Sequence, residues 1–474
     1  MRFLSHCGWP GGVALAAIAC VALPLTSPQA RADSLESALV QTYLNNPTLN
    51  SQRASVRATD ENVPQALSGY RPKISITASG GEQSLSGTSK VTSTNPSTYS
   101  TISGYNSPFS AGVSATQTLF NGFQTANRTR QAEAQVLAAR ETLRVTEQSV
   151  LLDGVTAYMN LLRDTAIVGL QKSNVEVLQE QLRQTRDRFN VGEVTRTDVA
   201  QSESSLASGR SQLLTAEANY NSSGAVYRKV VGSTPGKLAA ASPVDRFAPR
   251  GLASAVAAGM TGHPSVVSAQ YNIDVAQMQV KVAEASLYPT LSVTGNFTKN
   301  YLATGSLTTM ESYSASVLGQ LSVPIYQGGS EYSLIRQSKE TLGQRRIDFD
   351  AARDSVRQTV VQAWSQLEAA KSNIEATQAQ VQASEIALNG IREEARVGQR
   401  TTFDVLTAQQ NLVNARVGLV GAQRDRVVAS YTLLAGSGRL SPQVLGLRVP
   451  VYNPEVHYRQ VRDSWAGVRT PDGR

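Results

Sequence analysis

The sequence is poor in cysteine, in aromatic residues and in charge. Its two cysteines, Cys7 and Cys20, lie near the N-terminus of a 474-residue chain in which 6% of residues are aromatic and 17% are charged. If residues 1–32 are removed, no thiol remains, which excludes a disulfide framework, a cysteine-based metal site and thiol catalysis. So little bulky apolar material favours long helices packed through small residues over one large globular core.

Catalytic signatures are also missing. Beyond residue 32 the chain has two histidines, His263 and His457, which are far apart in sequence, and it has no Gly-x-Ser-x-Gly elbow and no phosphate-binding loop. We interpret both histidines as structural or solvated. The sequence therefore predicts a protein that is not an enzyme, holds no cofactor or metal, and takes its energy from a partner.

The first 32 residues are predicted to be a secretory signal peptide. Arg2 gives a basic start, the apolar stretch 12–25 is too short to span a bilayer, and Ala30-Arg31-Ala32 is a small-x-small cleavage site. Removal of Arg2 and Arg31 leaves 42 basic residues against 36 acidic ones, so the formal charge falls from +8 to +6. The alternatives are a buried N-terminal helix and lipidation of Cys20.

No long apolar run follows the signal peptide. Because no later segment has about 18 consecutive apolar residues, the sequence predicts no transmembrane helix. If the exported chain enters a membrane, it must do so as strands.

The chain repeats itself. Segments of the first half recur in the second half in the same order and with small gaps, which makes chance similarity improbable. The sequence therefore predicts one structural unit that occurs twice, at 33–232 and 250–438, with a linker at 233–249 and a polar tail at 439–474. We expect the linker at the waist of the assembly, and the tail wrapped on its outside or hanging free. The matching segments are Asn46-Pro47 with His263-Pro264, Tyr70-Arg71-Pro72 with Tyr288-Pro289, Phe120-Asn121-Gly122 with Tyr326-Gln327-Gly328, and 189–199 with 395–405.

Each unit has the same predicted elements: a helix (47–69 in the first unit), two strands, a long helix and a return helix. Alternation with a period of two marks the strands, and the Ser- and Thr-rich connections 81–104 and 299–311 are predicted to be exposed loops. A seam with a period near 3.5 marks the proline-free long helices, at about 100 Å for some 65 residues. The predicted strands are 73–84, 105–119, 290–299 and 312–323, the long helices 123–190 and 329–396, and the return helices 197–231 and 403–434.

Four amphipathic strands per chain predict a shared membrane barrel. Strands of about 10 residues are long enough to cross a bilayer when tilted. A sheet in lipid cannot keep open edges, and the smallest membrane barrels have about 8 strands. Several chains must therefore contribute: two would supply 8 strands and three would supply 12, with the helices continuing below as a tube.

In its duplication and its motifs, the chain resembles the TolC family of outer-membrane efflux and secretion channels over roughly residues 33–438. The residues that carry the resemblance are the Tyr-x-Pro and Tyr-Pro segments before the strands, Phe-Asn-Gly and Tyr-Gln-Gly after them, and the turns 191–199 and 397–405. The resemblance implies a mixed α/β membrane protein: a homotrimer with a 12-strand transmembrane β-barrel in the outer membrane of a Gram-negative bacterium and a 12-helix α-barrel across the periplasm. Its implied partners are outer-membrane lipid, an inner-membrane ABC or RND-type transporter and a periplasmic adaptor protein, which open the closed inner end. The implied cargo is protein, by type I secretion, or small molecules, by multidrug efflux.

Two turns would form the periplasmic tips. Gly192 and Gly398 stand where the chain reverses between helices, and the resemblance implies that these turns, with Val191 and Val397, dock the adaptor. Asp198 and Asp404 follow near the starts of the return helices, where an aspartate also serves as a helix cap. On a threefold axis, however, a carboxylate forms a ring that favours cations.

The resemblance implies roles for several tip residues. The family's entrance ring matches Asp404, while its second ring position is Thr407 here, so the second ring is absent. The family's polar latch between the two turns matches Arg400 on one turn with Thr197 and Asp198 on the other. A latch tyrosine of the family is replaced by Ala395. The alternative is that the tip arginines only solvate the helix ends.

Two rival functions remain. A periplasmic adaptor also has helical hairpins, but it has one hairpin beside small β domains and no duplication. A nucleic-acid-binding coiled coil would suit the basic charge. The signal peptide and the scattered basic residues oppose it, so no nucleic acid is expected as a partner.

Overall fold

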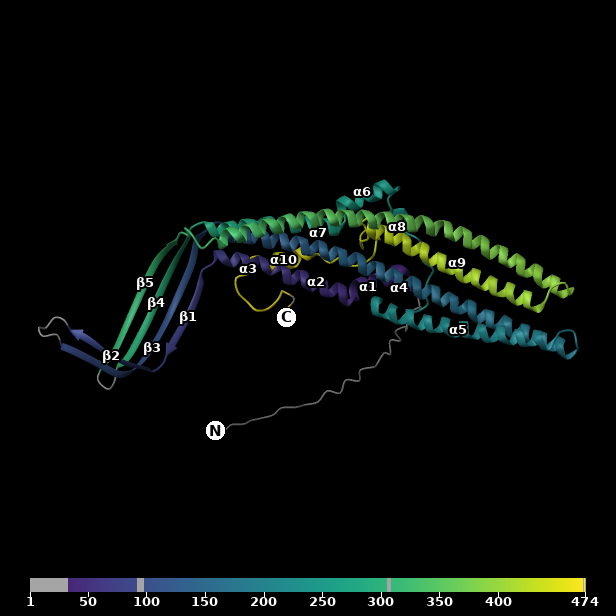
Figure 1. Cartoon of the computed structure of the whole chain (residues 1–474), viewed down its shortest axis with the longest axis horizontal. Coiled ribbons are helices and arrows are strands. Elements are labelled where there is room, and N and C mark those ends of the chain that lie inside the picture. Colours follow the sequence, from purple (N-terminus) through teal and green to yellow (C-terminus); the bar gives the residue numbers. More distant parts are fainter. Residues whose placement is uncertain (1–32, 92–97, 305–307, 472, 474) are drawn as a thin grey trace, which may run out of the picture.

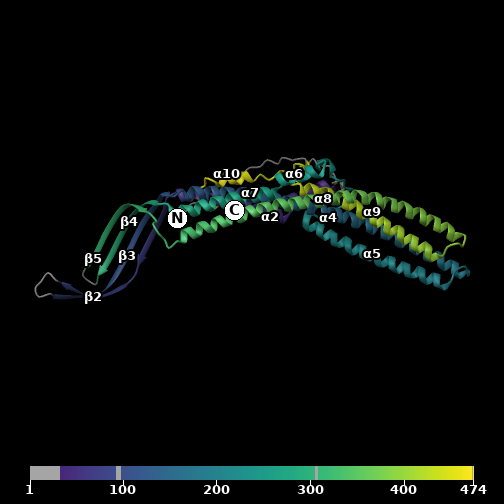
Figure 2. The ribbon, with the colours of Figure 1, turned by 45° about the horizontal axis from the view of Figure 1, so that its top comes forward.

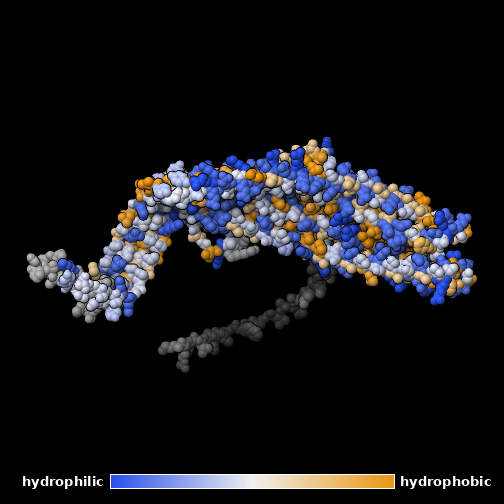
Figure 3. All heavy atoms as spheres, viewed as in Figure 1, coloured by the Kyte–Doolittle hydropathy of each residue, from blue (hydrophilic) through white to orange (hydrophobic). Residues whose placement is uncertain are grey.

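The structure, a computed structural model, describes residues 33–91, 98–304, 308–471 and 473. The predicted signal peptide lies outside the described residues. The described chain is elongated, with a β-sheet at one end and long helices running away from it (Figures 1 and 2). Hydrophilic and hydrophobic side chains are interspersed along the helical part (Figure 3).

The two long helices dominate the fold. Helix α4 (Gln124–Asn190) and helix α8 (Ser330–Arg396) have 67 residues each, or about 100 Å at 1.5 Å per residue, and their bounds lie within a residue or two of the predicted ones. Each turns back into a return helix, α5 (Arg196–Val231) or α9 (Thr402–Gly436). The remaining helices are α1 (Leu35–Asn45), α2 (Pro47–Asp60), α3 (Asn62–Leu67), η1 (Ser68–Tyr70), η2 (Asp245–Phe247), α6 (Leu252–Gly262), α7 (Pro264–Glu284), η3 (Ala285–Leu287) and α10 (Pro454–Val461).

Short helices precede the strands in both repeats. The single helix predicted at 47–69 is divided into α2, α3 and η1, and the predictions did not include α1 and α6. Prolines set two of the starts, because Pro47 and Pro264 stand at the first helical position, where no backbone N–H is needed. The side chains of Asn46 and His263 cap the same two helices.

The predicted seam of α8 packs into the core. Its buried residues form a cluster with Ala255 of α6, Val266 of α7 and Leu433 of α9. Small residues in this stripe let the neighbouring helices approach closely, which is how a chain with few aromatics still closes its interior. The seam residues in the cluster are Val356, Val360, Ala363, Leu367 and Ala370.

The largest core cluster lies near the middle of the helices, where α4 meets α1, α5, α9 and the linker. Tyr158 is its centre: the hydroxyl donates to the backbone oxygens of Asp33 (2.7 Å) and Ala239 (2.6 Å). Burial raises the pKa of Tyr158 to about 12, so this hydroxyl stays protonated. One side chain thus ties the start of the described chain and the linker between the repeats to α4.

The sheet is antiparallel throughout, in the order β1-β3-β4-β5, and β2 pairs with the outer part of β3. Since β1 and β2 lie end to end along β3, the sheet is four strands wide. The strands are β1 (Lys73–Gly80), β2 (Gln83–Val91), β3 (Thr98–Asn121), β4 (Thr290–Thr304) and β5 (Thr308–Ser322).

The predicted loops were wrong. Residues 83–91 and 98–104, expected in a loop, form a hairpin in which Gln83 pairs with Asn106 and Val91 with Thr98. Because β4 ends at Thr304, opposite Asn106, this hairpin projects beyond the sheet (Figure 1). Its sequence is rich in Ser, Thr and Gly, so the alternation that marks a half-apolar strand is weak. Residues 300–304 and 308–311 likewise extend β4 and β5 into the other predicted loop.

The two faces of the sheet differ in polarity. One row across all four strands is Ile76, Val113, Phe297 and Ala315, and the next is Ile74, Ala115, Gly295 and Val317. The opposite face carries rows such as Ser75, Ser114, Asn296 and Ser316. No part of the described chain covers the apolar face, where Ile76 is 79% exposed and Val317 is 77% exposed.

The outer edges of the sheet are open. Within the described residues β1 pairs only with β3, and β5 pairs only with β4. The backbone groups on the far sides of both strands therefore have no partner strand in this chain, and such edges invite pairing with another chain.

None of the described helices is both long enough and apolar enough to cross a membrane.

Matched glycines join the sheet to the long helices. Gly122 and Gly328 adopt φ +62° and +69°, and a Cβ on Gly122 would lie 2.6 Å from Cβ of Tyr288, whereas none of the described atoms lies within 4 Å of the same point on Gly328. The second junction therefore needs glycine only for its backbone, and the first needs it for space as well.

We expect Gly328→Ala to cost about 1 kcal/mol of stability, the penalty of a left-handed backbone for alanine. Gly122→Ala should cost about 1–3 kcal/mol more, because it also overpacks the contact with Tyr288. Thermal unfolding in detergent, followed by circular dichroism, checks the pair. Equal shifts for both variants would contradict the described contact.

Candidate functional site

The candidate site is the pair of helix turns at the end farthest from the sheet (Figure 1). Both turns have the same backbone. Gly192 and Gly398 adopt φ +82° and +80°, and each donates its N–H to the carbonyl three residues before it. The N–H of the following residue, Glu193 or Gln399, donates to the carbonyl five residues before it at 2.9 Å. This is the usual left-handed closure of a helix C-terminus.

Each return helix begins with a capping box. Thr195 and Asp198 hold each other's backbone N–H groups, and Thr401 and Asp404 do the same. The carboxylate of Asp404 also accepts from the Thr401 hydroxyl at 2.9 Å, and that of Asp198 from the Thr195 hydroxyl at 2.7 Å. The capping interpretation is therefore correct for both aspartates within one chain.

These hydrogen bonds keep the carboxyl groups charged. The pKa of Asp404 lies below its ordinary value of 3.8, chiefly because the backbone N–H and the hydroxyl of Thr401 stabilise the carboxylate, with a smaller effect from Arg400. The pKa of Asp198 is lowered in the same way by Thr195. Both tips thus carry a fixed negative charge at the start of the return helix, where a helix favours one.

The residues of the predicted latch find partners within their own turns. Arg400 Nε donates to Glu394 at 2.8 Å, and Asp198 is held by Thr195. Arg188 and Glu193 make an ion pair across the first turn at 2.9 Å, with the arginine at the position that Glu394 occupies in the second repeat. Thr197 is exposed. Within one described chain, therefore, the structure does not bring Arg400 to Thr197 or Asp198.

The remaining predicted residues lie on the surface. Val191 and Val397, beside the turn glycines, are large exposed apolar side chains. Thr407 lies on the exposed side of α9, one turn beyond Asp404. Each tip therefore combines an exposed valine with charged side chains in the same turn.

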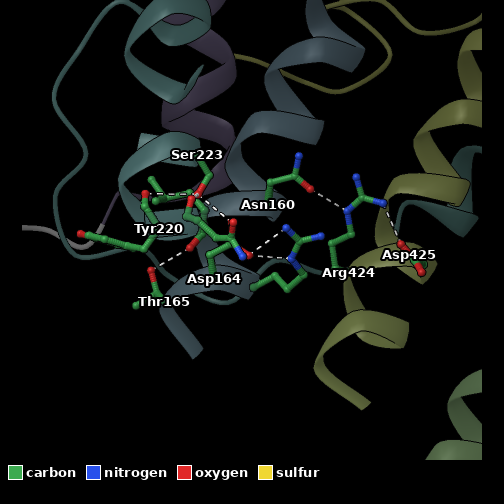
Figure 4. A network of polar contacts seen from close by, with 10 residues as sticks. Asn160, Asp164, Thr165, Tyr220, Ser223, Arg424 and Asp425 are labelled. Carbon is green, nitrogen blue, oxygen red and sulfur yellow. Dashed lines mark hydrogen bonds and ion pairs between the residues drawn. The ribbon is translucent and has the colours of Figure 1, made fainter. Parts of the chain in front are cut away.

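The sequence interpretation missed the polar contacts that join the two helix pairs. Gln409 of α9 donates to Asn174 of α4 at 3.4 Å and accepts from Arg392 of α8 at 3.1 Å. Farther along, Arg424 of α9 donates to Asn160 of α4 at 2.9 Å (Figure 4). Polar residues at otherwise apolar seam positions were the available signal.

Asp164 anchors the other side of the same region. It is buried, accepts a hydrogen bond from Ser223 of α5 at 2.7 Å and pairs with Arg163 at 2.8 Å (Figure 4). Helix α4 is thus linked to its own return helix and to that of the other repeat. Among the described residues, no cluster of histidine, cysteine and carboxylate side chains is suited to a metal ion.

Comparison with known proteins identifies the family. Residues 38–233 and 260–439 match the family described as outer membrane efflux protein. The chain belongs to that family. It is 43% identical to the outer membrane efflux protein BepC of Brucella suis over 451 residues, which cover 95% of each chain. It is 27% identical to the outer membrane protein TolC of Escherichia coli over 433 residues, 88% of this chain and 85% of TolC.

A solved structure shows the same fold. The outer membrane channel CmeC of Campylobacter jejuni matches with a TM-score of 0.75 at 16% identity, covering 90% of this chain and 89% of CmeC. The resemblance to the TolC family, the outer-membrane location and the general role as an export channel are therefore confirmed.

The capping boxes make a direct prediction. Thr195→Ala and Thr401→Ala should each cost about 1 kcal/mol, because each removes a hydroxyl that satisfies a helix N-terminus. Thr402→Ala, at the first residue of α9 and outside the box, is the matched control. Hydrogen exchange of the tip amides should accelerate in the two cap variants and stay unchanged in the control. Equal protection in all three would show that the caps do not hold the tips.

Proposed function

We propose that three copies of this chain form one export conduit, with a 12-strand transmembrane barrel in the outer membrane and a 12-helix tunnel across the periplasm. The observation that carries the proposal is the open sheet, four strands wide, with an uncovered apolar face and two unpaired edges. Because β1 and β5 run antiparallel, β5 of one copy can pair with β1 of the next. The apolar face then meets lipid, and the polar face lines the lumen.

The helices support the same assembly. Two long helices per copy, each about 100 Å, extend from the sheet, and each turns into a shorter return helix at a tip of matching geometry. We assign the opening of the tunnel to an inner-membrane ABC or RND-type transporter and a periplasmic adaptor protein, which would dock at Val191, Gly192, Val397 and Gly398. The cargo is protein, small molecules or both.

The test of this function is fractionation followed by electrophoresis. A channel should require detergent for extraction from the outer membrane and should migrate as a trimer that heating converts to monomers. The alternative, a periplasmic adaptor of the same export complex, predicts no such barrel-stabilised trimer. A protein released without detergent would contradict the channel.

We further propose that Asp404 forms an acidic ring at the periplasmic entrance. Its capping bonds depress the carboxyl pKa below 3.8, so the ring stays charged as the pH falls toward that value. Cation selectivity in planar bilayers should therefore hold from about pH 7 to about pH 5. Asp404→Asn should abolish the selectivity, whereas Asp198→Asn, which alters the equivalent cap, should leave it. If the cation selectivity instead changes between pH 7 and pH 5, groups other than Asp404 produce it.

The latch remains a proposal about the assembled trimer. We propose that Arg400 closes the entrance by pairing with Asp198 and Thr197 across the two turns, in exchange for its present partner Glu394. The double variant Arg400→Ser with Asp198→Ala should raise single-channel conductance.

Glu394→Gln distinguishes the two pairs. If the latch joins the turns, this variant leaves Arg400 free to bind Asp198, and conductance stays low. Conductance that rises in Glu394→Gln but not in Asp198→Ala would assign closure to the pair within one turn. Unchanged conductance in the double variant would refute the proposed latch.

A further inference from the structure

The C-terminal segment follows the helices back to the sheet. Leaving α9, it contributes Leu440 and Leu445 to the core cluster near the middle of the helices. The backbone N–H of Tyr452 then donates to the hydroxyl of Tyr43 at 3.1 Å. Arg53 of α2 lies over both tyrosine rings, 4.4 Å from the centre of Tyr43 and 5.3 Å from that of Tyr452.

Helix α10 continues along α2 and α4. His457 Nδ1 lies 3.0 Å from a carboxylate oxygen of buried Asp60, and the guanidinium of Arg140 lies 5.1 Å from the ring centre of Tyr458. Arg462 pairs with Glu133 at 3.5 Å. The C-terminal segment, predicted to wrap the tunnel or hang free, is thus held against the helices by side-chain contacts along its length, as far as the base of the sheet (Figure 2).

Beyond α10, the segment presents a tryptophan next to Arg71. The Arg71 guanidinium donates to the carbonyl of Ser464 at 2.6 Å and lies 4.5 Å from the ring centre of Trp465. Yet the Trp465 side chain is 73% exposed, and Val468 is 99% exposed. The only other tryptophan beyond residue 32, Trp364, packs against the cluster around α8. Exposure of an indole that is held in one place is unfavourable in water.

The position of Trp465 along the molecule explains its exposure. Arg71 stands two residues before β1, at the level where the sheet's apolar face begins. Each of the four junctions between strands and helices places an exposed aromatic ring at this level. These rings are Tyr70, Phe123, Tyr288 and Tyr326. In a membrane-spanning sheet, aromatic rings mark the lipid–water interface.

We propose that residues 464–468 form a lipid anchor, in which Trp465 and Val468 insert into the phospholipid headgroup region of the inner leaflet of the outer membrane. The indole suits this region because its ring is apolar while its N–H seeks polar partners. Arg71, beneath the ring, and Arg469, next along the chain, supply cations for phosphate groups. The anchor goes beyond the channel function and rests only on the sheet lying in the membrane.

Tryptophan fluorescence in liposomes tests the anchor. In Trp9→Phe with Trp364→Phe, all emission comes from Trp465. We expect phospholipids brominated near the headgroup end of the acyl chain to quench this emission more than phospholipids brominated near the terminal methyl. Aqueous acrylamide should quench it weakly. Arg71→Gln should release the indole, so that emission shifts to longer wavelength and acrylamide quenching increases.

A second reporter separates failure of the anchor from failure of the membrane placement. Phe297→Trp, in a chain whose three native tryptophans are phenylalanine, reports on the apolar face of the sheet. If brominated lipid quenches this reporter but not Trp465, and acrylamide reaches Trp465, the anchor is refuted and the channel stands. If Trp465 is shielded from both quenchers, it contacts protein, which also refutes a lipid anchor. If brominated lipid quenches neither reporter, the sheet is not in the membrane, and both proposals fall.

Discussion

The structure depends on one constraint: backbone groups at a sheet edge have no substitute partner in lipid. This chain supplies an apolar face across β1, β3, β4 and β5 but leaves the outer edges of β1 and β5 open among the described residues. Neither feature is stable in a solitary chain, because the first needs lipid or protein cover and the second needs another strand. In the proposed trimer, several copies close the sheet together, and their symmetry would pass to the helices through the short junctions that follow the strands.

Duplication gives the second organising principle. The two tips share a left-handed glycine, a capping box and an Arg–Glu pair, so each helix pair is closed by its own contacts before any copy meets another. The repeats differ where they meet other elements: Gly122 is crowded by Tyr288 while Gly328 is open. Polar residues such as Asn174 and Gln409 then join the pairs across the seam. In the proposed tunnel, the wall would consist of helix pairs closed by their own contacts and linked to each other by a few polar contacts, an arrangement suited to opening.

Much of this could be predicted from the sequence. The seam that includes Val356 and Val360 predicted the long helices, because an apolar period near 3.5 persists only where one stripe of a helix is buried. The alternation around Ile74 predicted the strands, because one face of the sheet is apolar. The hairpin formed by 83–91 and 98–106 could not be found that way, because it projects beyond the end of β4 and its sequence is rich in Ser, Thr and Gly. The pairing of Arg400 with Glu394 was equally invisible, since exposed arginines have several carboxylates within reach and sequence does not rank them.

The central claim is that the two faces of the sheet meet different solvents. The predicted mature chain has no cysteine, so a single introduced thiol reports its own surroundings. Ile76→Cys and Ser75→Cys place neighbouring thiols on opposite faces of β1. In intact outer membranes, a charged, membrane-impermeant maleimide should label Ser75→Cys through the aqueous lumen and spare Ile76→Cys, whose thiol faces lipid and is not ionised. The same reagent should label Ile76→Cys once the protein is denatured in detergent. Equal labelling of both thiols by the charged reagent would contradict a membrane-spanning sheet.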